Sequence, residues 1–151
     1  MPALFAFVHH AAAFALVSAL VIELVLLRTE LTSTTARILL KADMALGISA
    51  GVLLAVGLAR VVYFEKGAAY YFHNAAFIGK LSLFLAIGLL SIYPTVVFLS
   101  WKKSLEEGRL PQAPAAQLRA IRRIVHLELA GVVLILLCAA LMARGIGQFG
   151  A

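Results

Sequence analysis

Five ionisable side chains lie near the ends of long apolar stretches, at what would be one level of a membrane. Three are histidines, whose neutral imidazole can ligate a haem iron or carry a proton. The other two are an arginine and a lysine, which can pair with the acidic groups of a bound ligand. This outer layer therefore predicts a site for b-type haem, or a comparable anionic planar ligand, formed by His9, His10, Arg60, His73 and Lys80.

The two adjacent histidines cannot serve the same purpose. On a helix His10 points about 100° away from His9, so only one of them is expected to face a bundle and ligate iron. The sequence leaves open which one does. Small residues follow at Ala11–Ala13 and Ala15, and they permit a helix or a flat macrocycle to approach closely. The alternative is a pair of interfacial histidines bonded to backbone or lipid.

The two cations of the outer layer also have alternative interpretations. Lys80 and Arg60 could extend toward the membrane surface and leave only their apolar stems in the hydrocarbon. They could instead bind a propionate, for which a guanidinium is better suited than an ammonium. His73 would share a face with Lys80 if the third helix began early enough to include it, and it would then be a possible second iron ligand.

Three carboxyl groups form an inner layer nearer the other side of the membrane. An ionisable group in hydrocarbon is costly and usually functional, so Glu23 and Glu128 are candidates for a proton path. Asp43 lies near the expected start of a span. We therefore expect it to pair at the interface with a neighbouring cation, which could be Arg28, Lys41 or Arg123.

The elements that position these residues are predicted by hydropathy. The 151-residue chain is 64% hydrophobic, with a mean hydropathy of +1.03, which is too apolar for a soluble domain of this size. We expect an all-α integral membrane bundle that forms one domain over residues 1–151. Each apolar stretch is about as long as the ~20 helical residues that cross a bilayer. The four expected spans are approximately 3–27, 44–64, 75–100 and 124–143.

Helix ends and orientation follow from local signals. Thr34 or Thr35 could cap the second helix, Gly67 could end it, and Asn74 could cap the third. The fourth helix is expected to begin in water at Ala115. Nine of the thirteen Lys and Arg residues fall in the first and third connections, which predicts that these are cytoplasmic and that both termini lie outside. Interfacial aromatic belts are expected at Trp101, Tyr63, Tyr70 and Tyr71.

The expected partners are lipid and further copies of the chain. A GxxxG pattern, Gly47 to Gly51, permits close helix contact and favours a homo-oligomer. Arg119, Arg122 and Arg123 form a basic stripe suited to anionic lipid headgroups. The sequence has no P-loop, dinucleotide fingerprint, HExxH or GxSxG motif, and a chain so buried in lipid is not expected to bind nucleic acid.

The pattern resembles a bacterial family of small predicted membrane proteins of unknown function, and the resemblance covers nearly the whole chain. The residues that carry it are HHAAAF (His9–Phe14), Glu23, Asp43 with Gly47, Arg60 followed by EKGAAYYFHN (Glu65–Asn74), Lys80, SIYPT (Ser91–Thr95) and LMARG (Leu141–Gly145).

More remotely, the chain is similar to HemJ-type protoporphyrinogen oxidases and CopD-like membrane proteins. Those have a histidine early in span one and a lysine early in span three, positions that His9 or His10 and Lys80 take here. The resemblance implies a haem-associated histidine, and hence a redox protein that relays electrons or oxidises a porphyrin or quinol. The alternatives are a proton- or ion-coupled transporter subunit and a non-catalytic membrane scaffold.

Overall fold

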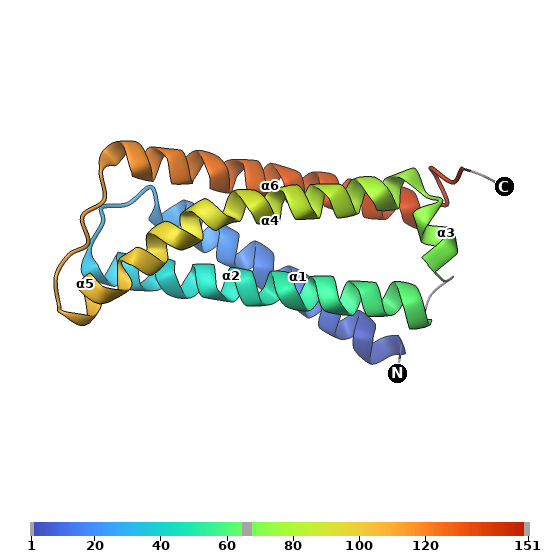
Figure 1. Ribbon diagram of the computed structural model, residues 1–151, viewed down its shortest axis with the longest axis horizontal. Coiled ribbons are helices and arrows are strands. Elements are labelled where there is room, and N and C mark those ends of the chain that lie inside the picture. The colour runs from blue at the N-terminus through green and yellow to red at the C-terminus, as the bar shows by residue number, and fades with distance from the viewer. Residues whose placement is uncertain (1, 65–67, 150–151) are drawn as a thin grey trace.

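The computed structural model describes residues 2–64 and 68–149, and the elements in this part of the chain are helical. Four long helices alternate in direction, and three short elements lie at the turns (Figure 1). In chain order they are α1 (Pro2–Leu26), α2 (Ser33–Ala59), the π-helical η1 (Arg60–Phe64), α3 (Ala68–Phe72), α4 (Ala75–Ser100), α5 (Lys102–Glu106) and α6 (Ala115–Ala143).

The predicted all-α membrane bundle is confirmed. Within the described residues four helices are long and apolar enough to cross a membrane, and they contain α1, α2, α4 and α6. The N-terminus and the C-terminus lie at one end of the bundle, which we call the terminal end (Figure 1). The turns between α1 and α2 and between α4 and α6 lie at the other end. These turns, with α5 and the first turns of α2 and α6, carry nine Lys and Arg residues, so we call it the basic end.

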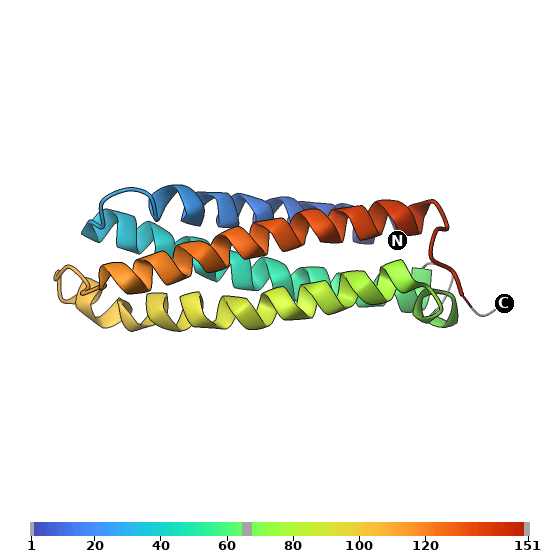
Figure 2. The same cartoon turned by 90° about the horizontal axis from the view of Figure 1, so that it is seen from above.

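The four long helices associate as two pairs. Helix α1 packs mainly against α2, and α4 packs mainly against α6, whereas contacts between the pairs are fewer. Helices α1 and α4 each lie next to both α2 and α6. Helices α1 and α4 are therefore diagonally opposite each other in the bundle, and over the described residues their backbones make no close contact. Helix α4 runs from beside α6 at the terminal end toward the start of α2 at the basic end (Figures 1 and 2). The pairs therefore converge at the basic end.

Helix α2 begins at Ser33, well before the start near residue 44 that hydropathy predicts. Its N-cap is Thr32, whose hydroxyl accepts a hydrogen bond from the Thr35 backbone N–H while the Thr32 N–H donates to the Thr35 hydroxyl. This capping box satisfies two N–H groups of the first turn. The expected cap at Thr34 or Thr35 is wrong by two or three positions. The helix extends beyond the apolar span because its polar first turns remain at the interface.

The predicted start sites of the last two long helices are confirmed. Asn74 caps α4 by accepting a hydrogen bond from the Phe77 N–H, and α6 begins at Ala115. The Asn74 amide, which is fully buried, also donates to the Ile146 carbonyl and to the Gln148 side chain. These bonds attach the C-terminal segment to the start of α4. Gly67, the expected end of the second helix, lies outside the described residues.

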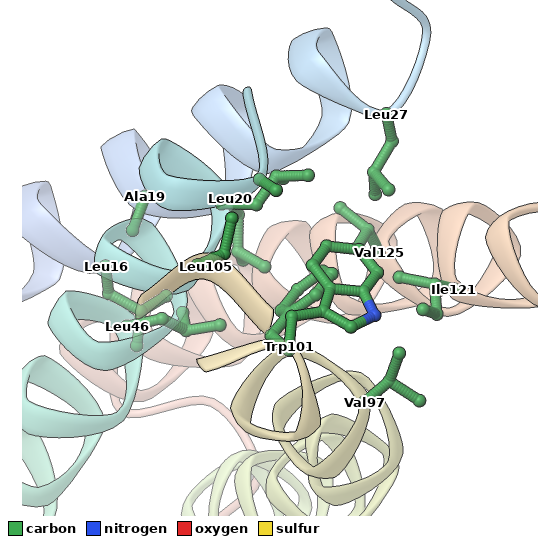
Figure 3. Close-up of a cluster of buried hydrophobic side chains, with 13 residues drawn as sticks. Leu16, Ala19, Leu20, Leu27, Leu46, Val97, Trp101, Leu105, Ile121 and Val125 are labelled. Carbon is green, nitrogen blue, oxygen red and sulfur yellow. The ribbon is translucent and has the colours of Figure 1, made fainter. Parts of the chain in front are cut away.

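The main hydrophobic core lies toward the basic end and includes residues of α1, α2, α4, α5 and α6 (Figure 3). Trp101 is at its centre: it is only 3% exposed, and its ring centroid is 5.0 Å from that of Phe98. The expectation that Trp101 belongs to an interfacial belt is wrong, because the α4–α5 turn directs the indole inward between the two helix pairs.

Candidate functional site

A cavity of about 550 Å³ occupies the middle of the bundle between the two helix pairs. Its volume is within the range of roughly 300–1,000 Å³ that is usual for small-molecule and cofactor sites. Its wall is mostly aliphatic and includes side chains of α1, α2, α4 and α6. Some of these, such as Leu58 on α2 and Ile92 on α4, are also exposed on the surface of the bundle, so the cavity opens sideways between helices.

The structure distinguishes the two adjacent histidines. His9 is partly buried and lines the cavity, and its Nδ1 atom is buried without a hydrogen-bond partner. His10 is exposed, and its Nδ1 lies 2.6 Å from the Ala6 carbonyl oxygen of its own helix. His10 is also among the residues that line the cavity, but it is exposed where His9 is partly buried. The predicted divergence of the two rings is confirmed, and His9 is the residue that faces inward.

Gly57 of α2 explains how His9 fits between two helices. A Cβ atom at Gly57 would lie 3.4 Å from His9 Cε1, at the limit of ordinary van der Waals contact. The absence of a side chain therefore leaves room for the imidazole at the cavity wall. A larger residue would press directly on the ring.

The two cations of the outer layer lie at the same end of the cavity. Lys80 of α4 and Arg60 both line it, and both are close enough to His9 to interact with it electrostatically. Lys80 is partly buried and forms no salt bridge with a described residue. Arg60 begins the π-helical turn η1, a rare geometry that is frequent at functional sites. The two positive charges favour an anionic group at the terminal end of the cavity.

His73 is not brought to this site. It precedes α4, whose first residue is Ala75, so it is not on the helical face that carries Lys80. The imidazole is exposed, does not line the cavity, and its ring centroid is 6.1 Å from that of Phe149. His73 was expected to be a second ligand only if the third helix began early enough to include it. Helix α4 begins after His73, so this condition is not met.

The other end of the cavity is polar and acidic. Glu128 of α6 lines it and is 1% exposed, and the polar group that faces its carboxyl is the Ser91 hydroxyl. Ser91 and Thr95 of α4 complete this end. Ser91 is eleven residues after Lys80, so helical spacing places both on one face of α4. Thr95 was missed, although its position four residues after Ser91 places the two hydroxyls on one face.

Asp43 corrects the expectation of an interfacial ion pair. It is 3% exposed, its carboxylate accepts a hydrogen bond of 2.8 Å from the Thr95 hydroxyl, and it forms no salt bridge with a described residue. The early start of α2 places Asp43 almost three turns inside the helix, away from the cations at the interface. Glu23 of α1 is also fully buried but does not line the cavity.

The arrangement combines an apolar wall, a buried imidazole nitrogen without a partner and two cations at one end, which are features that can accommodate an apolar molecule with an acidic group. The described residues contain no group of three or more His, Cys, Asp or Glu side chains that could hold a bare metal ion. A metal would therefore have to arrive with most of its ligands supplied by the molecule that carries it.

Comparison with known families gives one match. The model of the family described as "Predicted membrane protein (DUF2214)" matches residues 1–147, almost the whole chain. Comparisons with curated proteins and with solved structures give no match.

Proposed function

Because the chain belongs to the family of predicted membrane proteins DUF2214, and because a cavity of about 550 Å³ lies inside the bundle, we propose that it binds b-type haem there as a membrane redox protein. The observation that carries this proposal is the buried, unpartnered Nδ1 of His9 at the wall of an apolar cavity beside Lys80. A buried polar atom without a partner is costly, so it marks a place where a ligand is expected.

The residues fit the group. His9 would supply the axial imidazole, and Lys80, with Arg60, would pair with the propionates at the terminal end. The aliphatic wall would exclude water from the macrocycle, and Gly57 leaves the space in which the His9 ring stands. His73 has no part in this site. The remote resemblance to HemJ-type and CopD-like proteins implies a haem-associated histidine at the same place in span one.

A haem bound there would supply one-electron redox chemistry, which suits electron relay or the oxidation of a porphyrin or quinol. The contribution of the chain itself would be to bind and orient the haem. The sideways openings of the cavity lead to the lipid, which is where a hydrophobic substrate or electron partner would be found.

Haem titration of the purified protein tests the proposal. The wild type should take up haem and show a Soret band, and Lys80→Ala should bind roughly ten- to hundredfold more weakly, because a charge-assisted hydrogen bond contributes about 1.5–3 kcal/mol. The position of the Soret band should not change, since Lys80 is not the iron ligand. Arg144→Ala is the control, since Arg144 is exposed at the same end and does not line the cavity. A protein that stays colourless when haem is supplied would exclude this function.

We also propose that the basic end faces the cytoplasm and that the membrane is a bacterial inner membrane. Short loops rich in Lys and Arg are retained on the cytoplasmic side, and nine such residues lie at this end. Arg119, Arg122 and Arg123 on the first turns of α6 would there meet the anionic headgroups of the inner leaflet.

Self-association through α2 is the remaining proposal. Gly47 and Gly51 are exposed, and a Cβ atom at either would meet nothing within 4 Å, so a flat strip of the helix is open to a second copy. We expect Gly51→Leu to shift the protein from oligomer toward monomer, as measured by light scattering in mild detergent. Gly88→Leu, at an exposed glycine of α4 with the same open space, should not. An oligomer that survives Gly51→Leu would place the contact on another face.

A further inference from the structure

Three carboxyl groups from three helices lie close together toward the basic end of the bundle. They are Glu23 of α1, Asp43 of α2 and Glu128 of α6, with exposed fractions of 0%, 3% and 1%. Glu23 is near enough to both of the others to interact with them electrostatically, and so is Glu128 to Asp43. Three acidic side chains on different helices therefore share one buried region.

Among the described residues no positive charge compensates this cluster. None of the three forms a salt bridge there, both carboxyl oxygens of Glu23 lack a hydrogen-bond partner, and the polar group that faces Glu128 is the Ser91 hydroxyl. From α4 the cluster is faced by two hydroxyls, those of Thr95 and Ser91, and by no charged group.

The cations and the histidine of the basic end are directed elsewhere. The Arg37 guanidinium donates a hydrogen bond to the Leu105 carbonyl. A guanidinium nitrogen of Arg28 lies 3.3 Å from Nε2 of the exposed His126. Lys41 and Arg123 are exposed at the surface. Leaving three carboxylates ionised and unpaired in an apolar interior would be very costly.

A proton is the partner that resolves this cost. The described acidic, histidine and cysteine side chains do not converge in groups of three that could hold a metal ion. A buried acid with no cation to pair with is most easily kept in the membrane as the neutral form. In that form each carboxyl is also a hydrogen-bond donor, which is what the oxygens of Glu23 and Glu128 need from one another or from water.

Glu128 is the member of the cluster that reaches the cavity. Glu128 lines it together with Ser91 and Thr95, whereas Glu23 does not. We infer that Glu23, Asp43 and Glu128 form a buried proton-binding site, and that Glu128 is the member that exchanges protons with water or a ligand in the cavity. In each exchange the O–H bond of Glu128 breaks and the proton passes to an acceptor in the cavity. Glu128 then regains a proton from its neighbours or from the cavity.

Infrared spectroscopy of the full chain in lipid vesicles, with no haem added, tests this inference. At neutral pH the wild type should show the carbonyl absorption of protonated carboxyl groups in apolar surroundings, and the absorption should shift in heavy water. Glu23→Gln, Asp43→Asn and Glu128→Gln should each remove one contribution. In Glu128→Gln the heavy-water shift of the remaining absorption should also be slower, because the route to the cavity is lost. Glu30→Gln, at an exposed glutamate, should leave the spectrum unchanged.

The wild-type spectrum alone shows whether carboxyl groups are protonated at neutral pH, even if a variant fails to fold. An absence of protonated carboxyl absorption at neutral pH would show that the cluster is ionised, and it would overturn the inference. The same holds if the absorption is present but survives all three substitutions. The inference does not depend on haem, since the measurement is made without it, so haem binding and proton binding can fail separately.

Discussion

Replacing His9 with alanine should abolish haem binding, whereas replacing His10 should leave most of it. The reason is the direction of the two rings: His9 lines the cavity with a buried nitrogen that has no partner, and His10 is exposed with its Nδ1 beside the Ala6 carbonyl. Loss of the axial imidazole removes the bond between the chain and the iron. Haem content per polypeptide and the Soret spectrum, measured after purification from cells supplied with haem precursor, give the comparison.

Imidazole added to His9→Ala gives a control that separates ligation from folding. A variant that is folded but lacks the ligand should regain haem and its spectrum when free imidazole occupies the vacant space. The His10→Ala variant should need no imidazole. If both variants keep wild-type haem content and spectrum, His9 is not the ligand. If His10→Ala alone loses haem, the assignment of the two rings is reversed.

Hydropathy was sufficient to predict the fold because a bilayer restricts the chain strongly. Each span needs about 20 apolar residues, and every backbone hydrogen bond in the hydrocarbon must be satisfied within the helix. Four apolar stretches separated by short connections therefore specify four helices. The start of α4 after its Asn74 cap follows from capping chemistry, and the start of α6 at Ala115 follows from the proline that precedes it; both are confirmed. The early start of α2 at Ser33 could not be predicted from hydropathy, because polar helical turns at the interface look the same as a loop.

The relative directions of side chains on a single helix could be predicted from the sequence, but the contacts between helices could not. Helical spacing predicted that His9 and His10 diverge, yet the choice between them depends on Gly57 of a neighbouring helix, which spacing within one helix does not reveal. Asp43 was assigned to the interface because it was expected to lie near the start of the apolar span. His73 was placed with Lys80 on the condition that α4 began earlier than it does. Each of these differences arises from a helix boundary or from a partner helix.

Trp101 was assigned to the membrane surface by composition alone, and its burial leads to the second large effect. We expect Trp101→Ala to lower the free energy of unfolding by about 2–3 kcal/mol, below the ~3–5 kcal/mol usual for a large aromatic residue in a soluble core. The value is smaller because lipid is as apolar as the core, so the cavity and the lost packing account for most of the cost. The melting temperature in mild detergent should fall by roughly 5–10 °C.

Phe14→Ala is the matched control, since Phe14 is 78% exposed on α1 and its ring packs little against the rest of the bundle. It should change the melting temperature far less than Trp101→Ala does. The contrast tests the arrangement of the bundle: Trp101 and Phe98 belong to the main core in which residues from both helix pairs meet, whereas the second cluster, around Val61 and Phe77 at the terminal end, is smaller. Equal effects of the two substitutions would mean that the pairs are joined elsewhere. A larger effect of Trp101→Ala would locate the junction at the basic end, below the cavity that the two pairs enclose.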